Sequence, residues 1–349
     1  MSLLHLTHLS KDFRLKGSAF GKPLVLRALD DITLTIHKGE TLALVGESGC
    51  GKSTLGWIVA GLHKATSGQM QVNGQTAQTG KARARQIQIV FQDPFGSLNP
   101  TMTVGALITE PILLHDLAPR AAIPARLDSL LSLVGLRPEI GRRYPHELSG
   151  GQRQRVALAR ALAVEPELIV CDEAVSALDV SVQAQIANLL QEIQAKTGVA
   201  LLFISHGLSL VRHISHRVAV MYLGRIVEEG PTEQVFASPR HPYTRALIAA
   251  TLEPLPAASR PRMKLTGEVP SPLAPPSGCT FRTRCPQAQA ICATDKPPHD
   301  AKPHAVACWR SDDLPAFVPT TLTPPARMLA ALQLYRAAAA RRATEDTLT

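Results

Sequence analysis

The sequence has few aromatic residues and no long hydrophobic run. Phenylalanine, tryptophan and tyrosine make up 4% of its 349 residues. Leucine, valine, isoleucine and alanine are plentiful, as buried parallel strands with covering helices require. No apolar stretch approaches the roughly 18 residues of a membrane span, and the first residues lack the basic start and apolar core of a secretory signal. We therefore expect a soluble, cytosolic chain.

Charged residues are also modest, at 19%, whereas hydrophobic residues make up 45%. This balance excludes a wholly disordered protein, and the length predicts two domains at roughly 150 residues each. Lysine and arginine outnumber aspartate and glutamate by 37 to 28, which gives a net charge of +9. Such a charge suits nucleotide phosphates, nucleic acid or an anionic membrane surface, and it is equally compatible with an ordinary solvated surface.

Proline divides the chain into two regions. Eighteen of the 27 prolines lie between Pro231 and Pro325, so this stretch is expected to consist of turns, short elements and extended loops. The preceding 230 residues alternate short apolar runs with helical patterns, which predicts a mainly parallel α/β core. We expect buried strands at 41–45, 168–171 and 200–204, and an interrupted helical region at 112–136.

The first of these strands is followed by a phosphate-binding pattern, G-x-x-x-x-G-K-[ST]. It is matched by Gly46, Glu47, Ser48, Gly49, Cys50, Gly51, Lys52 and Ser53, and Thr54 continues into an apolar helical run. The glycines let backbone N–H groups point at phosphate oxygens, and the helix N-terminus adds a favourable dipole. We predict that Lys52 contacts the β- and γ-phosphates and that Ser53 binds Mg²⁺.

Two further motifs have the chemistry of nucleotide hydrolysis. Asp172 and Glu173 end the second apolar strand, where we predict that Asp172 holds Mg²⁺ and Glu173 orients or deprotonates the attacking water. A glycine turn, which we call the signature turn, then precedes another helical run. It consists of Leu148, Ser149, Gly150, Gly151 and Gln152. This second helix N-terminus is too far from the first loop to serve the same phosphate from the same side. It makes sense if it caps the γ-phosphate bound by another chain.

The order of these motifs resembles that of the nucleotide-binding subunits of ABC transporters. The resemblance implies a P-loop (RecA-like) α/β core with an inserted helical subdomain at about 93–162, and it implies ATP and Mg²⁺ as cofactors. It also implies a dimer in which each subunit completes the ATP site of the other. The remaining family positions are Phe13 for stacking on adenine, Gln92 for Mg²⁺ and the attacking water, His206 for the γ-phosphate, and Ser176, Ala177, Leu178 and Asp179 for the dimer interface.

Longer strings narrow the resemblance to the ATP-binding subunits of bacterial dipeptide and oligopeptide importers. These strings are FGSLNPTMTVG, ALDVSVQAQI and RHPYTRAL. The resemblance implies a nucleotide-binding domain over 1–235 and a small proline- and cysteine-rich C-terminal domain over 236–325. The alanine- and arginine-rich tail, 326–349, is not covered by it. We predict a marginal amphipathic helix there, with a disordered tail or a membrane-surface helix as alternatives.

Four cysteines cluster in this C-terminal region, namely Cys279, Cys285, Cys292 and Cys308. Four thiolates can close a tetrahedral Zn²⁺ site or bind an iron–sulfur cluster, and free buried thiols are the third alternative. The spacing lacks the tight C-x2-C pairs that are common in zinc ribbons. Relatives of the importer group share the pattern GC-x-F-x-x-RC, and the resemblance implies a [4Fe–4S] cluster with a structural or redox-sensing role.

Cys50 lies within the phosphate-binding loop. Loop N–H groups and the ammonium of Lys52 are expected to lower the pKa of its thiol. We therefore predict that a maleimide inactivates the protein and that bound MgATP protects it. A buried, inert thiol is the alternative.

The resemblance implies ATP hydrolysis that powers the import of di- and oligopeptides. The implied partners are a second ATP-binding subunit, identical or related, two membrane permease subunits and an extracytoplasmic substrate-binding protein. They would place the chain peripherally on the cytoplasmic face of the bacterial inner membrane. Nickel, glutathione or an opine-like compound are alternative cargoes, because the ATPase subunit does not touch the cargo.

A soluble ABC ATPase that acts on nucleic acid is a further alternative, which the basic charge favours slightly. Such proteins usually carry two cassettes or a long coiled coil between the motifs. This chain has one cassette, with about ninety residues between Lys52 and the signature turn. We therefore expect no nucleic-acid partner.

Overall fold

A mixed seven-stranded sheet forms the centre of the computed structural model, which describes residues 2–15, 24–176, 178–251, 267–299 and 302–317. The strand order is β11-β10-β9-β3-β8-β7-β6. The pairs from β9 to β6 are parallel, whereas β10 and β11 join antiparallel at one edge. The strands are β3 (Thr41–Val45), β6 (Ile87–Val90), β7 (Leu168–Asp172), β8 (Ala200–Ile204), β9 (Arg217–Tyr222), β10 (Arg225–Pro231) and β11 (Ala305–Val306).

The three strands predicted from apolar runs are confirmed as β3, β7 and β8. Every residue of these strands is buried, because helices cover the parallel part of the sheet and leave no face for water. The three strands are neighbours in the order β3-β8-β7. Their carboxyl ends therefore lie side by side, and this is the edge at which parallel α/β sheets bind ligands.

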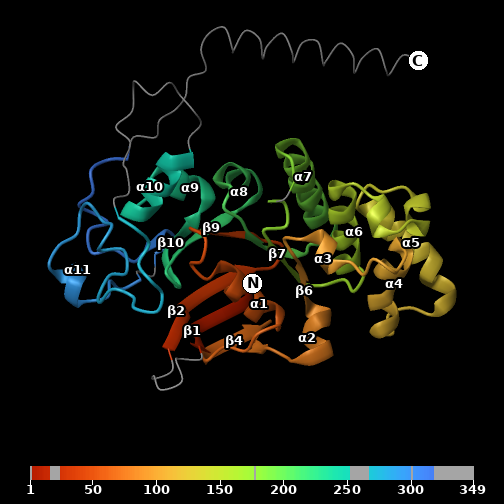
Figure 1. The fold of residues 1–349 in the computed structure, drawn as a ribbon, viewed down its shortest axis with the longest axis horizontal. Helices are drawn as coiled ribbons and strands as arrows, with labels where there is room; N and C mark the ends of the chain where they lie inside the picture. The colour runs from red at the N-terminus through yellow and green to blue at the C-terminus, as the bar shows by residue number, and fades with distance from the viewer. Residues whose placement is uncertain (1, 16–23, 177, 252–266, 300–301, 318–349) are drawn as a thin grey trace, which may run out of the picture. The chain divides into compact units, whose positions relative to one another are not determined.

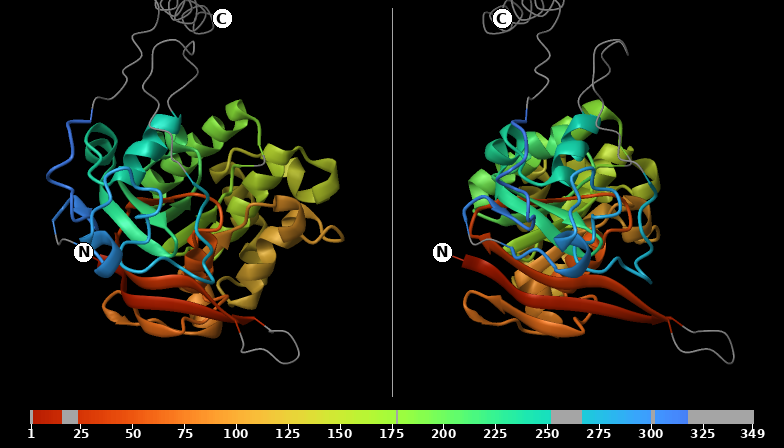
Figure 2. Two further views of the ribbon diagram at one scale, coloured as in Figure 1. Left: turned by 60° about the vertical axis from the view of Figure 1, so that its left-hand side comes forward. Right: turned by 90° about the vertical axis from the view of Figure 1, so that its left-hand side faces the viewer.

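A four-stranded antiparallel sheet was not predicted from the sequence. Its order is β2-β1-β4-β5, and it consists of β1 (Ser2–Leu15), β2 (Leu24–His37), β4 (Ser67–Val72) and β5 (Gln75–Thr76). Helix α1 (Lys52–Ala60) shares a hydrophobic core with both sheets, in which Leu6, Ile32, Leu44 and Leu55 are buried. Figure 2 shows the long β1–β2 ribbon below the central sheet.

A group of helices lies between β6 and β7 in the sequence and to one side of the central sheet (Figure 1). It contains α3 (Pro94–Ser97), α4 (Val104–Leu114), α5 (Ile123–Leu133) and α6 (Gly150–Leu162), with short 3₁₀ turns at Arg120–Ala122, Pro138–Arg142 and Pro145–Glu147. The predicted interruption of the helical region is confirmed. Helix α4 ends at Leu114, and Pro124 takes a place in the first turn of α5, where proline is tolerated. Helix α2 (Gly80–Gln86) precedes β6.

The remaining helices follow β7. They are α7 (Val180–Thr197), α8 (Leu208–Ile214), α9 (Thr232–Ala237), α10 (Pro242–Thr251) and α11 (Ile291–Thr294). Turns and extended loops dominate the described residues 267–299 and 302–317, as the proline content predicted. Helix α10 is a regular exception, because Pro242 occupies its first position and no other proline follows within it.

The C-terminal segment packs into the same hydrophobic core as the central sheet. The ring of Phe281 lies 5.2 Å from that of Tyr222 and 5.4 Å from that of Tyr243, measured between centroids. Residues up to Phe317 form one compact unit, so the fold gives no independent support for a separate small domain after residue 235. The predicted helix in the 326–349 tail lies outside the described residues.

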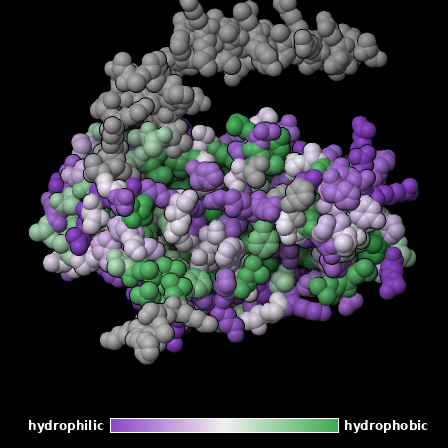
Figure 3. Space-filling model, viewed as in Figure 1, coloured by the Kyte–Doolittle hydropathy of each residue, from purple (hydrophilic) through white to green (hydrophobic). Residues whose placement is uncertain are grey.

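On the face shown in Figure 3, hydrophilic side chains cover much of the described surface, with smaller hydrophobic patches among them. In the part of the chain that the structure describes, no helix combines the length and the apolarity that crossing a bilayer requires.

Candidate nucleotide-binding site

The loop between β3 and α1 has a backbone that only glycine allows at two positions. Gly51 has φ 107°, and a Cβ added there would lie 2.4 Å from the carbonyl oxygen of Ala28. A Cβ on Gly46 would lie 2.2 Å from the carbonyl oxygen of Met221. Any side chain at either position would collide with backbone. Glycine is therefore required at these two positions by the close packing of the loop on β2 and on β9, as well as by the room that a phosphate would need.

Lys52 is the first residue of α1, and its side chain is buried within the loop. Its ammonium donates hydrogen bonds to the carbonyl oxygens of Gly46 at 2.8 Å and Glu47 at 3.0 Å. The loop thus encloses a positive charge at a helix N-terminus. A triphosphate in this loop would offer the ammonium stronger, charged acceptors than these carbonyls.

Ser53 and Asp172 form the candidate Mg²⁺ site. The hydroxyl of Ser53 donates a hydrogen bond to Oδ1 of Asp172 at 2.8 Å, so α1 and the end of β7 are in direct contact. Burial raises the pKa of the Asp172 carboxyl, and the Ser53 hydrogen bond opposes this shift. Mg²⁺ prefers oxygen ligands, and it usually takes one or two from carboxylates. The hydroxyl and carboxylate oxygens present here fit that preference.

Glu173 and His206 follow neighbouring strands, β7 and β8. Glu173 has φ 48°, and its backbone N–H donates to the carbonyl oxygen of Ile204 at 3.0 Å. This places its carboxylate 3.7 Å from Nδ1 of His206. The His206 side chain is 62% exposed and that of Glu173 only 19%. The two side chains therefore meet beside the carboxyl ends of β7 and β8.

A cavity of about 250 Å³ brings several predicted residues together. Phe13 lies on β1 beside the phosphate-binding loop, and Lys11 Nζ lies 4.8 Å from the centroid of its ring. Sequence reasoning missed Leu26, Ala28 and Pro272, because no local pattern marks them. The cavity is lined by Phe13, Leu26, Ala28, Ser48, Gly49, Gly51, Lys52, Ser53, Thr54, Glu173 and Pro272.

The signature turn does not line this cavity. Ser149 and Gln152 instead cap α6 reciprocally: the Gln152 N–H donates to the Ser149 hydroxyl, and the Ser149 N–H donates to the Gln152 amide oxygen. Leu148 is buried, and a Cβ on Gly151 would come within 2.9 Å of Val182. The turn thus has its capped conformation in the single chain. Because its two glycines carry no side chains, their backbone can be approached closely by a ligand bound elsewhere.

The predicted dimer loop joins Glu173 to α7. The Ser176 hydroxyl donates to the carbonyl oxygen of Glu173 at 2.9 Å, and Asp179 is the residue before the first turn of α7. Leu178 packs next to Gly150, since a Cβ added to that glycine would lie 3.2 Å from its Cδ2. Ala177 lies outside the described residues. Gln92 is exposed in the bend after β6 and does not line the cavity.

The four C-terminal cysteines line one cavity, next to His241 and Phe281. Cys279 N–H donates to the carbonyl oxygen of Cys292 at 2.9 Å, which joins two of the four residues through the backbone. Among the described residues, however, no three His, Cys, Asp or Glu side chains are placed so that they hold one metal ion. The predicted gathering of the cysteines is therefore seen, whereas a metal centre is not.

The prediction of a lowered pKa for Cys50 is wrong. The residue is 5% exposed, and burial raises the pKa of its thiol more than the nearby ammonium of Lys52 lowers it. The loop N–H groups and Lys52 were expected to dominate, but the sequence does not show how far the thiol is withdrawn from water.

The corrected expectation is that Cys50 reacts slowly with a maleimide at pH 7 and faster as the pH rises towards 9. A raised thiol pKa leaves little thiolate, the reactive form, at neutral pH. Peptide mapping by mass spectrometry after timed labelling measures this, with the Cys50→Ala protein as the blank. Rapid modification at pH 7 that MgATP suppresses would restore the original prediction.

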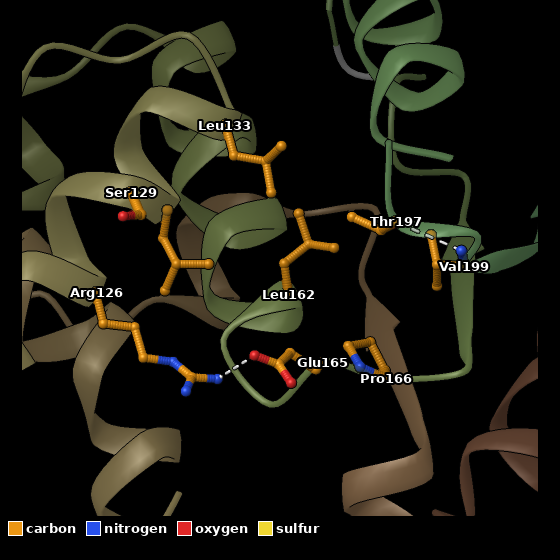
Figure 4. Close-up of a pocket in the computed structure, with 9 residues that line it drawn as sticks. Arg126, Ser129, Leu133, Leu162, Glu165, Pro166, Thr197 and Val199 are labelled. Carbon is orange, nitrogen blue, oxygen red and sulfur yellow. Dashed lines mark hydrogen bonds and ion pairs between the residues drawn. The ribbon is translucent and has the colours of Figure 1, made fainter. Parts of the chain in front are cut away.

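A second, larger cavity of about 440 Å³ lies between α5, the end of α6 and the connection from α7 to β8. Figure 4 shows Leu133 and Leu162 in its wall and the ion pair between Arg126 and Glu165, with 2.7 Å between Nη2 and Oε1, at its edge. None of the residues predicted from the sequence lines it. We assign it no part in nucleotide chemistry.

Comparison with known proteins shows which family the chain resembles. The ABC transporter family model matches residues 29–176, and the model of the oligopeptide/dipeptide transporter C-terminal region matches residues 227–292. An oligopeptide transport ATP-binding protein of Escherichia coli is 47% identical over 89% of this chain and 97% of its own. A dipeptide transport ATP-binding protein of Haemophilus influenzae is 46% identical over 84% of this chain and 92% of its own.

Solved structures show the same fold. The protein CbiO1 from Clostridium perfringens, part of an ABC transporter complex, superposes with a TM-score of 0.59 at 28% identity over 68% of this chain and 91% of its own. A dimeric ATP-binding cassette bound to ADP and Pi superposes with a TM-score of 0.58 at 27% identity over 66% of this chain and 99% of its own. The chain therefore belongs to the ABC transporter family, as an ATP-binding, ATP-hydrolysing subunit of the oligopeptide and dipeptide transporter group.

Proposed function

We propose that this chain hydrolyses ATP at the site between β3, β7 and β8 and thereby powers the import of di- and oligopeptides. The observation that carries the proposal is one cavity lined by Phe13, the phosphate-binding loop and Glu173. An aromatic ring for adenine, a buried cation for phosphates and a carboxylate for water thus meet in one place. The match to the peptide-transporter C-terminal model supports the peptide cargo.

We propose the following division of roles, which the geometry supports. Lys52 and the loop N–H groups hold the phosphates, and Ser53 and Asp172 would hold Mg²⁺, which neutralises charge on the transferred phosphoryl group. Glu173 would orient or deprotonate the attacking water. His206, whose Nδ1 lies 3.7 Å from Oε1 of Glu173, would contact the γ-phosphate. Gln92, in the bend after β6, would reach the Mg²⁺ and water when nucleotide is bound.

A second subunit completes the site in this proposal. The signature turn lies outside the chain's own cavity, with its glycines available to a ligand held by a partner. Two subunits closing head to tail would each place this turn on the other's γ-phosphate, next to the Ser176–Asp179 loop. The ATPase dimer would act on two permease subunits. An extracytoplasmic binding protein would deliver the peptide to these permeases. The chain would lie peripherally on the cytoplasmic face of the bacterial inner membrane.

Uptake of labelled peptides by cells tests this function. Deleting the gene should abolish uptake of a radiolabelled di- or tripeptide, the wild-type chain should restore it, and the Glu173→Gln chain should not. Restoration of nickel or glutathione uptake instead, with peptide uptake unaffected throughout, would show that the motor belongs to another importer. Co-purification with nucleic acid rather than with permeases would overturn the transport function itself.

We also propose that the four cysteines hold a [4Fe–4S] cluster. Their common cavity supports this, because each cysteine of such a cluster binds a different iron and the sulfurs need not surround one ion. A single Zn²⁺, with Zn–S bonds of about 2.3 Å, is the alternative that four thiolates also allow. The cluster would supply structural cross-linking or redox sensing.

Anaerobically purified protein should contain about four iron and four sulfide per chain and show the broad visible absorption of a cluster. Cys285→Ser and Cys308→Ser proteins should each lose most of this iron. The matched control is Cys171→Ser, whose thiol is fully buried within β7 and lies outside the cavity. About one zinc per chain and no sulfide would identify the zinc alternative. The absence of both iron and zinc would show that the four thiols are free.

A further inference from the structure

The cysteine-rich segment reaches the phosphate-binding loop through one side chain. Arg284 immediately precedes Cys285, and its guanidinium forms a two-pronged ion pair with the carboxylate of Glu47. Nη1 lies 2.7 Å from Oε2, and Nη2 lies 3.0 Å from Oε1. The two residues are 237 positions apart in the sequence. This planar fork geometry is the strongest form of an arginine–carboxylate contact.

The surroundings of this pair restrict it to one arrangement. The Arg284 side chain is only 7% exposed, and its guanidinium carbon lies 5.9 Å from the centroid of the Tyr222 ring. The Arg284 N–H donates to the carbonyl oxygen of Phe281 at 3.0 Å, which fixes the turn between Cys279 and Cys285. The Glu47 side chain is 28% exposed, so the pair is partly shielded from water and its attraction is screened less than that of a fully exposed ion pair.

A second contact holds the backbone of the same glutamate. The Glu47 N–H donates to the hydroxyl oxygen of Tyr243 at 2.9 Å. Tyr243 lies on α10, and its ring centroid is 4.7 Å from that of Tyr222. Pro272, which precedes the cysteines, lines the nucleotide cavity. Three separate parts of the C-terminal segment thus touch the nucleotide site.

Glu47 places a negative charge in a loop that must receive a triphosphate. An unpaired carboxylate there would repel the phosphates. We propose that Arg284 is a positioning residue for ATP binding: it neutralises and holds Glu47, so that the cysteine-rich segment sets the affinity of the phosphate-binding loop for nucleotide. The proposal rests on the function assigned to the loop above. It adds a long-range residue that does not touch ATP but decides how well the loop accepts it.

The test compares MgATP affinities of purified full-length variants, measured by displacement of a fluorescent ATP analogue. Arg284→Gln should weaken binding about tenfold, because the unpaired Glu47 carboxylate then repels the phosphates. Adding Glu47→Gln to Arg284→Gln should recover most of the affinity, because the repelling charge is removed. Arg284→Lys should recover part of it. The matched control is Arg282→Gln, since Arg282 is two residues away and its side chain donates only to Ser277 in the described contacts.

Two further readouts separate this role from a purely structural one. Raising the salt concentration should reduce the deficit of Arg284→Gln, because salt screens the repulsion. In the assembled transporter, the KM for ATP should rise for this variant while kcat at saturating ATP stays near the wild-type value. If Arg284→Gln only destabilised the protein, adding Glu47→Gln would not restore its affinity for MgATP.

The outcomes are distinct. Wild-type affinity in folded Arg284→Gln protein, or a double variant as weak as Arg284→Gln alone, would overturn the role of Arg284 and leave the ATPase function intact. Failure of the wild-type chain itself to bind MgATP would instead overturn the proposed nucleotide site.

Discussion

The Glu173→Gln protein is expected to hydrolyse ATP at least about a hundredfold more slowly than the wild type and to accumulate as an ATP-bound dimer. The substitution keeps the shape of the side chain and removes the base, and positioned acid–base groups contribute about 10²–10⁴-fold in rate. Binding is preserved because Lys52, Ser53 and Asp172 are untouched. Phosphate release by the assembled transporter measures the rate, and light scattering with and without MgATP measures dimer formation.

The control for this variant is Glu192→Gln, which removes an exposed carboxylate on α7. It should leave both rate and dimer formation unchanged. Hydrolysis by Glu173→Gln at the wild-type rate would show that another group positions the water. A variant that is inactive but never pairs with itself or with a related subunit would contradict the proposed sharing of two ATP sites.

The Lys52→Ala protein should lose measurable MgATP binding. The lysine ammonium is the buried cation of the loop, and each hydrogen bond from a charged donor contributes about 1.5–3 kcal/mol. Two such bonds to phosphate oxygens correspond to a loss of at least about a hundredfold in affinity. The measurement is the rise in melting temperature on adding MgATP. At 100 times the Kd, a ligand adds about 2.7 kcal/mol to the free energy of unfolding.

The apo melting temperature of this variant is also expected to fall, since Lys52 bonds two loop carbonyls in the unliganded chain. The diagnostic quantity is therefore the increment caused by MgATP, which should vanish in Lys52→Ala and persist in Lys196→Ala. Lys196 is exposed near the end of α7. A full increment in the Lys52→Ala protein would show that the ammonium does not bind the phosphates.

Much of the candidate site was predictable because its residues are contiguous. The phosphate-binding loop, the Asp172–Glu173 pair and His206 each follow a short apolar run, and buried parallel strands leave a strong local signal. The antiparallel sheet was missed, although β1 carries Phe13. Its strands alternate less regularly, with several register shifts along β1 and β2, and half-buried strands give a weaker pattern than buried ones.

The chemistry of individual groups was less predictable than their identity. The pKa of Cys50 has the opposite direction to the one expected, because the depth of a side chain depends on what packs over it. The interruption by prolines was placed correctly in the α4–α5 region, yet Pro242 begins a regular helix. A proline at the first position of a helix and one in a loop look alike until the partner segments are known.

The sequence by itself determined the candidate phosphate-binding loop, the two acids at the end of β7 and the glycine turn before α6, because each is a short motif whose backbone and neighbours lie within a few residues. Only the tertiary structure decided which distant groups converge on that loop. Arg284, Tyr243 and Pro272 reach it from beyond residue 240 because the C-terminal segment packs its aromatic residues into the core beside β9 and β10. Contacts between residues 196 to 237 positions apart depend on how buried surfaces fit, and no local spacing encodes them.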